Sequence, residues 1–148
     1  LVVRFAQFGT FSDQEISLPP PSLVPTSQVV VSGWMTNFWG YGLYTLYRTD
    51  IRGNSYPSLS SELAGVAGDE QAELRPDYSI DPNTVRTISA SQLIAGHVPP
   101  GSLKDRKVIV TEPRTGSASR VGYFGHSLID PVYLDIAGSA KAKYRPSW

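Results

Sequence analysis

The sequence predicts an α/β domain, a three-layer α/β/α sandwich with a mixed, mostly parallel sheet. Val108-Ile109-Val110 is a β-branched run without polar alternation, which is typical of a strand covered on both faces. Val29-Val30-Val31 shows the same pattern. Helix-start signals at Pro57, Ala90 and Pro131 supply the helices that we expect to pack on this sheet.

Length and charge narrow the class of protein. A chain of 148 residues can form one domain with a real core, and we expect a single domain over residues 1–148. Thirteen basic and thirteen acidic residues leave no net charge, which disfavours nucleic acid or an anionic membrane surface as the main partner. The absence of cysteine excludes disulfides and thiol chemistry. No apolar run approaches the roughly 20 residues that span a bilayer.

The first predicted strand runs from Leu1 to Phe8 and stops at Gly9. Residues 10–27 are rich in proline and poor in periodic apolar positions, so they should form an extended surface loop. The second strand lies between Gln28 and Trp34, and Gly33 indicates a bend or bulge there.

An aromatic cluster follows the second strand. Its members are Trp34, Phe38, Trp39, Tyr41, Tyr44 and Tyr47. Propensity predicts a strand from Leu43 to Arg48 and a turn near Arg52-Gly53-Asn54. We favour a core or interface role for these rings over stacking on a ligand by about two to one. A carbohydrate-recognition or adhesion surface is the alternative.

The next helix should start near Pro57, which suits a first helical turn. Leu59, Leu63 and Val66 share one face, and Gly65 and Gly68 end the pattern. An acidic loop is then expected from Asp69 to Pro76. A short strand at Tyr78-Ser79-Ile80 should end in the turn Asp81-Pro82-Asn83.

The segment from Arg86 to Pro113 carries the strongest local signals. Ser89 and Gln92 have the spacing of a capping box, and Ile88 and Leu93 occupy the positions of a hydrophobic staple. A helix should therefore begin at Ala90 and end at Gly96. Pro99-Pro100-Gly101 forces a turn before the strand at Val108 to Val110.

The C-terminal part should hold one more helix. Arg114 to Ser127 is a Gly/Ser-rich loop. Asp130 and Pro131 suit the N-cap and first position of a helix that runs to about Lys141, with Val132, Ile136 and Ala140 on one face. Residues 143–148 would form a linker.

Three segments resemble the CHASE2 domain, an extracytoplasmic sensory module of bacterial membrane proteins. They are Leu18-Pro19-Pro20-Pro21, the stretch that starts Tyr56-Pro57-Ser58-Leu59, and the stretch from Ile88 to Gly96 that leads through Val98-Pro99 and Leu103-Lys104 into the Val108 strand. The likeness covers roughly Leu18 to Lys141. It departs after the strand, where Thr111-Glu112-Pro113-Arg114 replace the usual glycine and small residues.

The resemblance implies a role in signalling and not in catalysis. The chain would be the C-terminal part of such a domain, on the periplasmic or cell-surface side of a bacterial membrane. A small molecule or physical stimulus would act on it, and the parent protein's transmembrane helices would pass the signal to a cytoplasmic cyclase, kinase or phosphodiesterase. The family's upstream strands are missing, so an exposed sheet edge and a homodimer are expected.

Candidate binding residues follow the predicted strands, because open α/β sheets bind ligands beyond the carboxyl ends of their strands. They are Thr111, Glu112, Arg114, Asp81, Asn83, Asn37 and Trp39. Each also has a purely structural interpretation, such as a turn residue or a surface ion pair, and for any single residue we favour that interpretation.

Catalytic and cofactor motifs are not evident. The sequence shows no phosphate-binding glycine loop, no His-x-x-x-His pair and no acidic calcium loop, so no cofactor is expected. His97 and His126 lack a third metal ligand. His126, Ser127 and Asp130 could be drawn as a hydrolase triad, but no nucleophile elbow accompanies them. We give catalysis a prior of roughly one in twenty.

Overall fold

The structure is a computed structural model that describes residues 3–9, 18–38, 41–69, 72–81, 84–110 and 131–143. Within these residues the strands are β1 (Phe5–Gly9), β2 (Val29–Gly33), β3 (Met35–Thr36), β4 (Gly42–Leu46), β5 (Arg48–Ile51), β6 (Asn54–Pro57) and β7 (Glu73–Leu74). The helices are α1 (Leu59–Ala64), α2 (Ala90–Ile94) and α3 (Pro131–Lys143), and a 3-10 turn at Thr26–Gln28 precedes β2.

The described strands pair in small groups. β1 runs parallel to β2, with Phe5 opposite Val29. β5 and β6 form an antiparallel hairpin, and β3, β4 and β7 form an antiparallel group in that order. A parallel bridge between Val31 and Ser58 joins β2 to the start of α1. The strands therefore build several small sheets and not one wide sheet.

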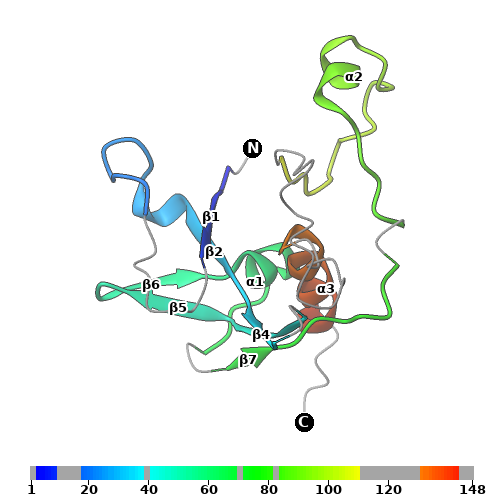
Figure 1. Ribbon diagram of the computed structural model, residues 1–148. Helices are drawn as coiled ribbons and strands as arrows, with labels where there is room; N and C mark the ends of the chain where they lie inside the picture. Colours follow the sequence, from blue (N-terminus) through cyan, green and yellow to red (C-terminus); the bar gives the residue numbers. More distant parts are fainter. Residues whose placement is uncertain are drawn as a thin grey trace.

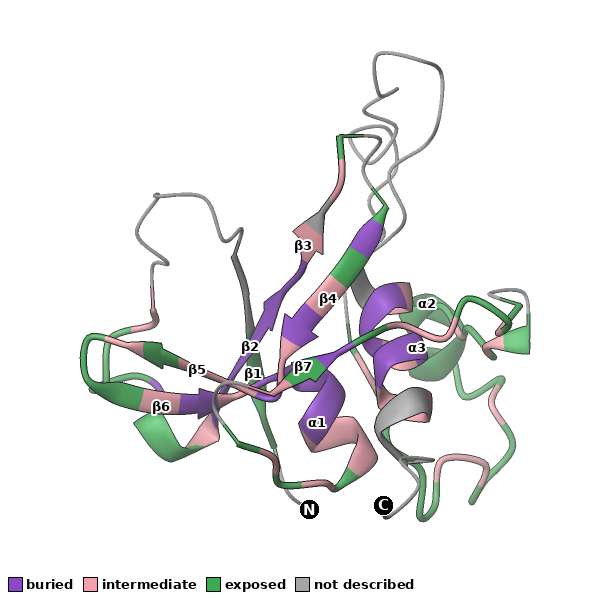
Figure 2. Cartoon of the chain, turned by 90° about the horizontal axis from the view of Figure 1, so that it is seen from below, coloured by how far each residue is buried: buried purple, intermediate pink, exposed green. Residues whose placement is uncertain are grey.

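The core surrounds β2, whose five residues are all buried. One apolar cluster contains Val24, Val29, Val31 and Tyr56. A second contains Trp34, Tyr47, Leu74 and Leu134. α1 and α3 pack against each other, and both contact β2. Figure 2 shows that burial is concentrated in β2, α1 and α3.

The predicted three-layer sandwich with a mostly parallel sheet is wrong. α1 and α3 lie together beside the strands, whereas α2 lies apart at the end of a long excursion of the chain (Figure 1). No residue of α2 is buried. A third layer needs an apolar sheet face for α2 to cover, and the described strands do not place one beside it.

The predicted central strand at Val108–Val110 is also wrong. This run takes no strand pairing, and Val108 and Val110 are 54% and 92% exposed. A β-branched run favours an extended backbone, but a strand also needs a neighbouring edge with which to pair. We refer to residues 84–110, which include α2 and this run, as the α2 arm.

Other local predictions have mixed outcomes. The strands near β1, β2 and β4 are confirmed, as is the turn at Arg52 and Gly53, where φ is 55° and 78°. The helix at Ala90 is confirmed, together with the capping box between Ser89 and Gln92. These features depend on residues only a few positions apart, which is why the sequence reveals them.

Several boundaries differ from the prediction. Pro57 is the last residue of β6, and α1 begins after its N-cap Ser58. The expected acidic loop contains β7. Tyr78 to Ile80 forms a turn, because the Asp77 carboxylate accepts hydrogen bonds from the backbone N–H and the hydroxyl of Ser79.

The face of α3 that packs inward is not the predicted one. The helix is confirmed and extends to Lys143, but its buried residues are Leu134, Asp135, Ala137 and Gly138. Ile136 and Ala140 are only half-buried. The predicted N-cap, Asp130, lies outside the described residues.

Gly138 permits the close approach of α3 to the rest of the core. A Cβ atom at this position would lie 2.7 Å from the Leu74 side chain, 2.9 Å from the Ser60 hydroxyl and 3.0 Å from the Trp34 ring. Contacts this short cannot form without movement of the neighbours. A glycine therefore brings α3 against α1 and Trp34.

Candidate functional site

A surface hollow of about 410 Å³ lies beside the C-terminal half of α1. It is lined by Arg48 of β5, Pro57 of β6, Ser61 and Glu62 of α1, the turn 65–68, and Lys107 of the α2 arm. Its volume falls within the range of about 300–1,000 Å³ that small-ligand sites occupy. The residues that line the hollow come from segments far apart in the sequence, so the hollow exists only in the folded chain.

Local signals fix both ends of α1 at this hollow. The Ser58 hydroxyl accepts a hydrogen bond from Ser61 N at 3.2 Å, which caps the first turn. Gly65 adopts a left-handed conformation with φ of 69° and donates to Glu62 O at 3.2 Å. Gly65 therefore ends the helix at the hollow, which Gly65 itself lines.

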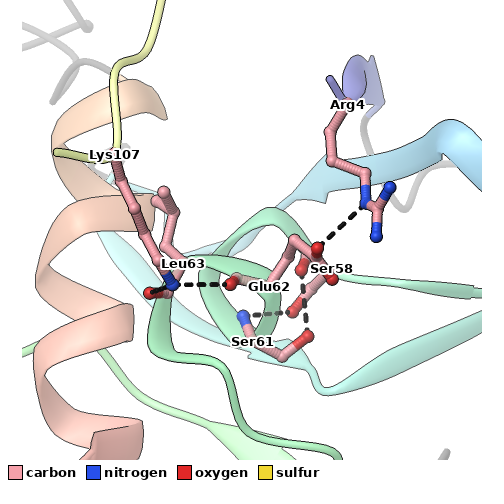
Figure 3. Close-up of polar contacts among 6 residues, drawn as sticks. All are labelled: Arg4, Ser58, Ser61, Glu62, Leu63 and Lys107. Carbon is pink, nitrogen blue, oxygen red and sulfur yellow. Dashed lines mark hydrogen bonds and ion pairs between the residues drawn. The ribbon is translucent and has the colours of Figure 1, made fainter. Parts of the chain in front are cut away.

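Lys107 binds carbonyl oxygens of the last turn of α1. Its Nζ atom donates to Glu62 O at 3.2 Å and to Leu63 O at 2.5 Å (Figure 3). The ammonium group thus adds hydrogen bonds to carbonyl oxygens of the last helical turn, where intrahelical donors are scarce. This contact ties the mostly exposed α2 arm to the body of the protein, and it does so at the edge of the hollow.

Basic groups outnumber acidic groups around the hollow. Glu62 pairs with Arg4 of the β1 segment, with 2.9 Å between Arg4 Nε and Glu62 Oε1 (Figure 3). Arg48 donates to the hydroxyl and the carbonyl oxygen of Ser55 at 2.9 and 3.0 Å. Among the described residues that line the hollow, the charged side chains are thus two cations, Arg48 and Lys107, and one carboxylate, Glu62, whose charge Arg4 offsets.

A buried polar cluster lies on the other side of α1. Asp135 of α3 is fully buried, and its Oδ1 atom accepts hydrogen bonds from the Ser60 hydroxyl at 2.8 Å and from Trp34 Nε1 at 3.2 Å. Its Oδ2 atom accepts a hydrogen bond from the Ser32 hydroxyl. One carboxyl group therefore connects α3 to α1, to β2 and to the residue that follows β2.

Burial raises the pKa of Asp135 from 3.8 to about 6, because desolvation penalises the charged form. The hydrogen bonds from Ser32, Ser60 and Trp34 act in the opposite direction, since they stabilise the carboxylate. Desolvation is the larger effect. The group therefore titrates in the mildly acidic range.

The predicted binding residues do not gather at this hollow. Asn37 lies in the β3–β4 connection, where its side-chain oxygen accepts a hydrogen bond from Tyr41 N at 3.0 Å. Asp81 stays at a turn, where its carbonyl oxygen accepts hydrogen bonds from the Thr84 backbone and hydroxyl. Asp81 therefore has the turn role that the sequence allowed. Thr111, Glu112, Arg114, Asn83 and Trp39 lie outside the described residues.

The aromatic cluster divides between core and surface. Trp34 and Tyr47 are buried, as the structural interpretation predicted, whereas Phe38 is 79% exposed and Tyr41 is 40% exposed. Trp34 therefore cannot stack on a ligand from solvent. Trp39 is outside the described residues.

The metal and hydrolase alternatives gain no support from the described residues. His97 is exposed in the turn after α2, where its backbone N–H donates to Gln92 O. No group of three or more potential metal ligands occurs in the part of the chain that the structure describes. His126, Ser127 and Asp130 lie outside it.

Sequence reasoning missed both sites described above. No sequence pattern indicated the hollow, because nothing in the sequence distinguishes Arg48, Glu62 and Lys107 from other charged surface residues. Asp135 did leave a signal, since it is a lone charged residue within an apolar helical segment. Such a residue on a packed helix usually has a specific polar partner.

Comparisons with protein-family models, with curated protein sequences and with solved structures found no match to this chain. Among the helices that the structure describes, none combines the length and the apolar character needed to cross a membrane.

Proposed function

We propose that this chain is a sensory module that recognises a small anionic ligand in the hollow beside α1. The segments that resemble CHASE2 support the sensory role. In that setting the module would lie on the outer side of a bacterial membrane. It would act through the transmembrane helices of its parent protein on a cyclase, kinase or phosphodiesterase.

One observation carries the choice of this hollow. Lys107 belongs to the α2 arm, but its ammonium group binds the end of α1 in the body. A ligand in the hollow would contact the arm and the body together. Binding would thereby favour the arrangement in which the arm is attached, and a signal is transmitted only when the ligand prefers one arrangement.

The charges around the hollow select the chemistry of the ligand. Lys107 and Arg48 lie on its lining, and Arg4 offsets the charge of Glu62. A carboxylate or phosphate group can accept charge-assisted hydrogen bonds from guanidinium and ammonium groups, and these are stronger than neutral hydrogen bonds. A neutral sugar could accept hydrogen bonds from these groups but lacks the opposite charge, and an organic cation would be repelled by them.

Thermal melting against a panel of small carboxylates, phosphates, neutral sugars and amines tests the proposal. An anionic ligand at a hundredfold excess over its dissociation constant should stabilise the folded state by about 2.7 kcal/mol. Lys107→Gln removes one charged contact and should weaken binding by roughly tenfold or more. Lys104→Gln is the matched control, because Lys104 is exposed on the same arm and does not line the hollow.

Two results would contradict the assignment. One is the absence of any anion in the panel that raises the melting temperature. The other is a bound anion whose affinity falls equally in Lys107→Gln and Lys104→Gln, because that pattern indicates general attraction to a basic surface.

The expected homodimer is a separate part of the proposal. β1 pairs with β2 on one side, and Val3 and Phe5 on this segment are both more than 40% exposed. Association through this strand would cover apolar side chains and an open edge. Sedimentation should show dimers between micromolar and millimolar concentration, and a monomer over that whole range would exclude the dimer.

A carbohydrate or adhesion surface is the second candidate, because Phe38 and Tyr41 expose their rings near the β3–β4 connection. Exposed aromatic rings can stack on sugars. If this candidate is correct, Phe38→Ala should abolish stabilisation by a sugar and leave stabilisation by anions unchanged. The two functions are therefore separated by the same melting assay.

A further inference from the structure

The Asp135 carboxyl group is unusual because it is fully buried and no basic side chain of the described residues neutralises it. Its pKa is set by desolvation and by hydrogen bonds from Ser32, Ser60 and Trp34, without a contribution from a charged neighbour among the described residues. Buried carboxylates are normally paired with a cation or a metal ion. An ionised Asp135 is therefore costly in this position.

Some of the groups that face Asp135 can form hydrogen bonds with its carboxyl group in either protonation state. Ser32 from β2 and Ser60 from α1 offer hydroxyl groups, which donate to a carboxylate and can accept from a carboxylic acid. Trp34 only donates. From β7, the nearby side chain is Leu74, which packs at Gly138 one turn further along α3. The facing groups are thus neutral throughout the physiological pH range.

We propose that Asp135 makes a pH-dependent packing contact. When its carboxyl group is protonated, this contact holds α3 against α1 and β2, and when the group is ionised, the packing loosens. The geometry supports the proposal because this one carboxyl group of α3 binds Ser32, Trp34 and Ser60, which lie 75 to 103 positions before it in sequence. This pH-dependent contact does not depend on a ligand in the hollow.

The direction of the pH effect follows from the raised pKa. Below pH 3.8 the carboxyl group is protonated in both the folded and the unfolded chain, so it makes no difference to their balance. Between pH 3.8 and about 6 the unfolded chain ionises first, and the folded state becomes less favoured as pH rises. Across this interval the folding equilibrium constant should fall by roughly a hundredfold on account of Asp135, and above pH 6 the effect is constant.

Urea unfolding of the protein and of Asp135→Asn from pH 4 to pH 8 tests this expectation. Asparagine keeps the shape but cannot ionise, so the folding constant of the variant should lack the hundredfold decline. Both proteins should carry His97→Gln and His126→Gln, because imidazole groups ordinarily titrate near pH 6.5. Asp50→Asn is the control, since Asp50 is an exposed carboxylate in the β5–β6 hairpin.

Trp34 provides a local reporter, because its indole N–H contacts the carboxyl group. With Trp39→Phe and Trp148→Phe, the fluorescence of Trp34 should change with a midpoint near pH 6. Ser60→Ala removes a hydrogen bond that favours the carboxylate, so it should move this midpoint to higher pH. A purely structural role for Ser60 would lower stability without moving the midpoint.

The unsubstituted protein supplies a measurement that does not depend on any variant. The carboxyl carbon resonance of Asp135 should titrate near pH 6. Amide exchange in α3, corrected for intrinsic rates, should accelerate between pH 4 and pH 6 and stay level above pH 6. Titration near pH 4 would overturn the proposal. So would α3 protection that stays constant from pH 4 to pH 6, or a pH profile of Asp135→Asn identical to that of the parent.

Discussion

β2 and the C-terminal end of the α2 arm have nearly the same sequence and opposite environments. Val29-Val30-Val31 and Val108-Ile109-Val110 are both β-branched runs without polar residues. The first is at most 3% exposed and pairs with β1, whereas Val110 is 92% exposed and the run takes no strand pairing. The difference shows that such a run specifies an extended backbone but does not specify its partners.

α1 and α2 repeat the comparison at the level of helices. Both begin after a serine whose hydroxyl accepts a hydrogen bond from a backbone N–H three residues later. α1 is packed against α3, and its Leu59, Ser60 and Ser61 are buried, whereas α2 has no buried residue. Capping therefore fixes where a short helix starts and leaves open what the helix covers.

The largest expected difference between the two valine runs comes from truncation. Val30→Ala should lower the free energy of unfolding by about 2 to 3 kcal/mol, because two buried methyl groups are lost and a cavity remains. Val110→Ala should change it by less than about 0.5 kcal/mol. Urea unfolding measures both. Equal losses at the two positions would mean that the α2 arm is buried in solution.

Gly138→Ala should have the next largest effect. Alanine normally stabilises a helix by about 1 kcal/mol relative to glycine, but here the new Cβ would collide with Leu74, Ser60 and Trp34. A net loss of about 1 to 2 kcal/mol is expected. Gly96→Asn on the α2 arm is the comparison, because Gly96 has φ of 71° and no neighbour within 4 Å, and asparagine tolerates that φ. Stabilisation by Gly138→Ala would refute the close packing of α3.

The smallest effects concern the two caps. Ser58→Ala should lower global stability by about 1 kcal/mol, because α1 belongs to the core. Ser89→Ala removes an equivalent cap and one side of the capping box, but α2 covers nothing, so only amide protection within α2 should fall. Hydrogen exchange and urea unfolding together distinguish the two outcomes. A global loss in Ser89→Ala would show that α2 contributes to the core.

Features that depend on neighbouring residues were predictable. The capping box at Ser89, the turn at Arg52 and Gly53, and the start of α3 near Pro131 all agree with the sequence. Each depends on hydrogen bonds or backbone preferences within about four positions. The burial of β2 on both faces was also predicted, from its apolar run. It is confirmed because the fold supplies β1 as a strand with which β2 pairs.

The candidate sites were not predictable in the same way. The prediction of binding residues at strand ends depends on a mostly parallel sheet, and that sheet is absent from the described residues. The hollow instead depends on Lys107 meeting an α1 carbonyl oxygen 44 positions away. No local sequence pattern predicts this hydrogen bond, since many exposed lysines could form a similar one.

By itself, the sequence determined the turn at Arg52 and Gly53, the start of α2 at Ala90 and the valine run that forms the innermost strand, because these depend on interactions between near neighbours. Only the tertiary structure decided that α2 stands apart, that Val110 is exposed and that Asp135 lies among Ser32, Trp34 and Ser60. Burial is a property of segments that are distant in sequence and meet in space. Its consequences, a hollow with an excess of basic groups and a carboxyl group with a pKa of about 6, appear only after those segments have met.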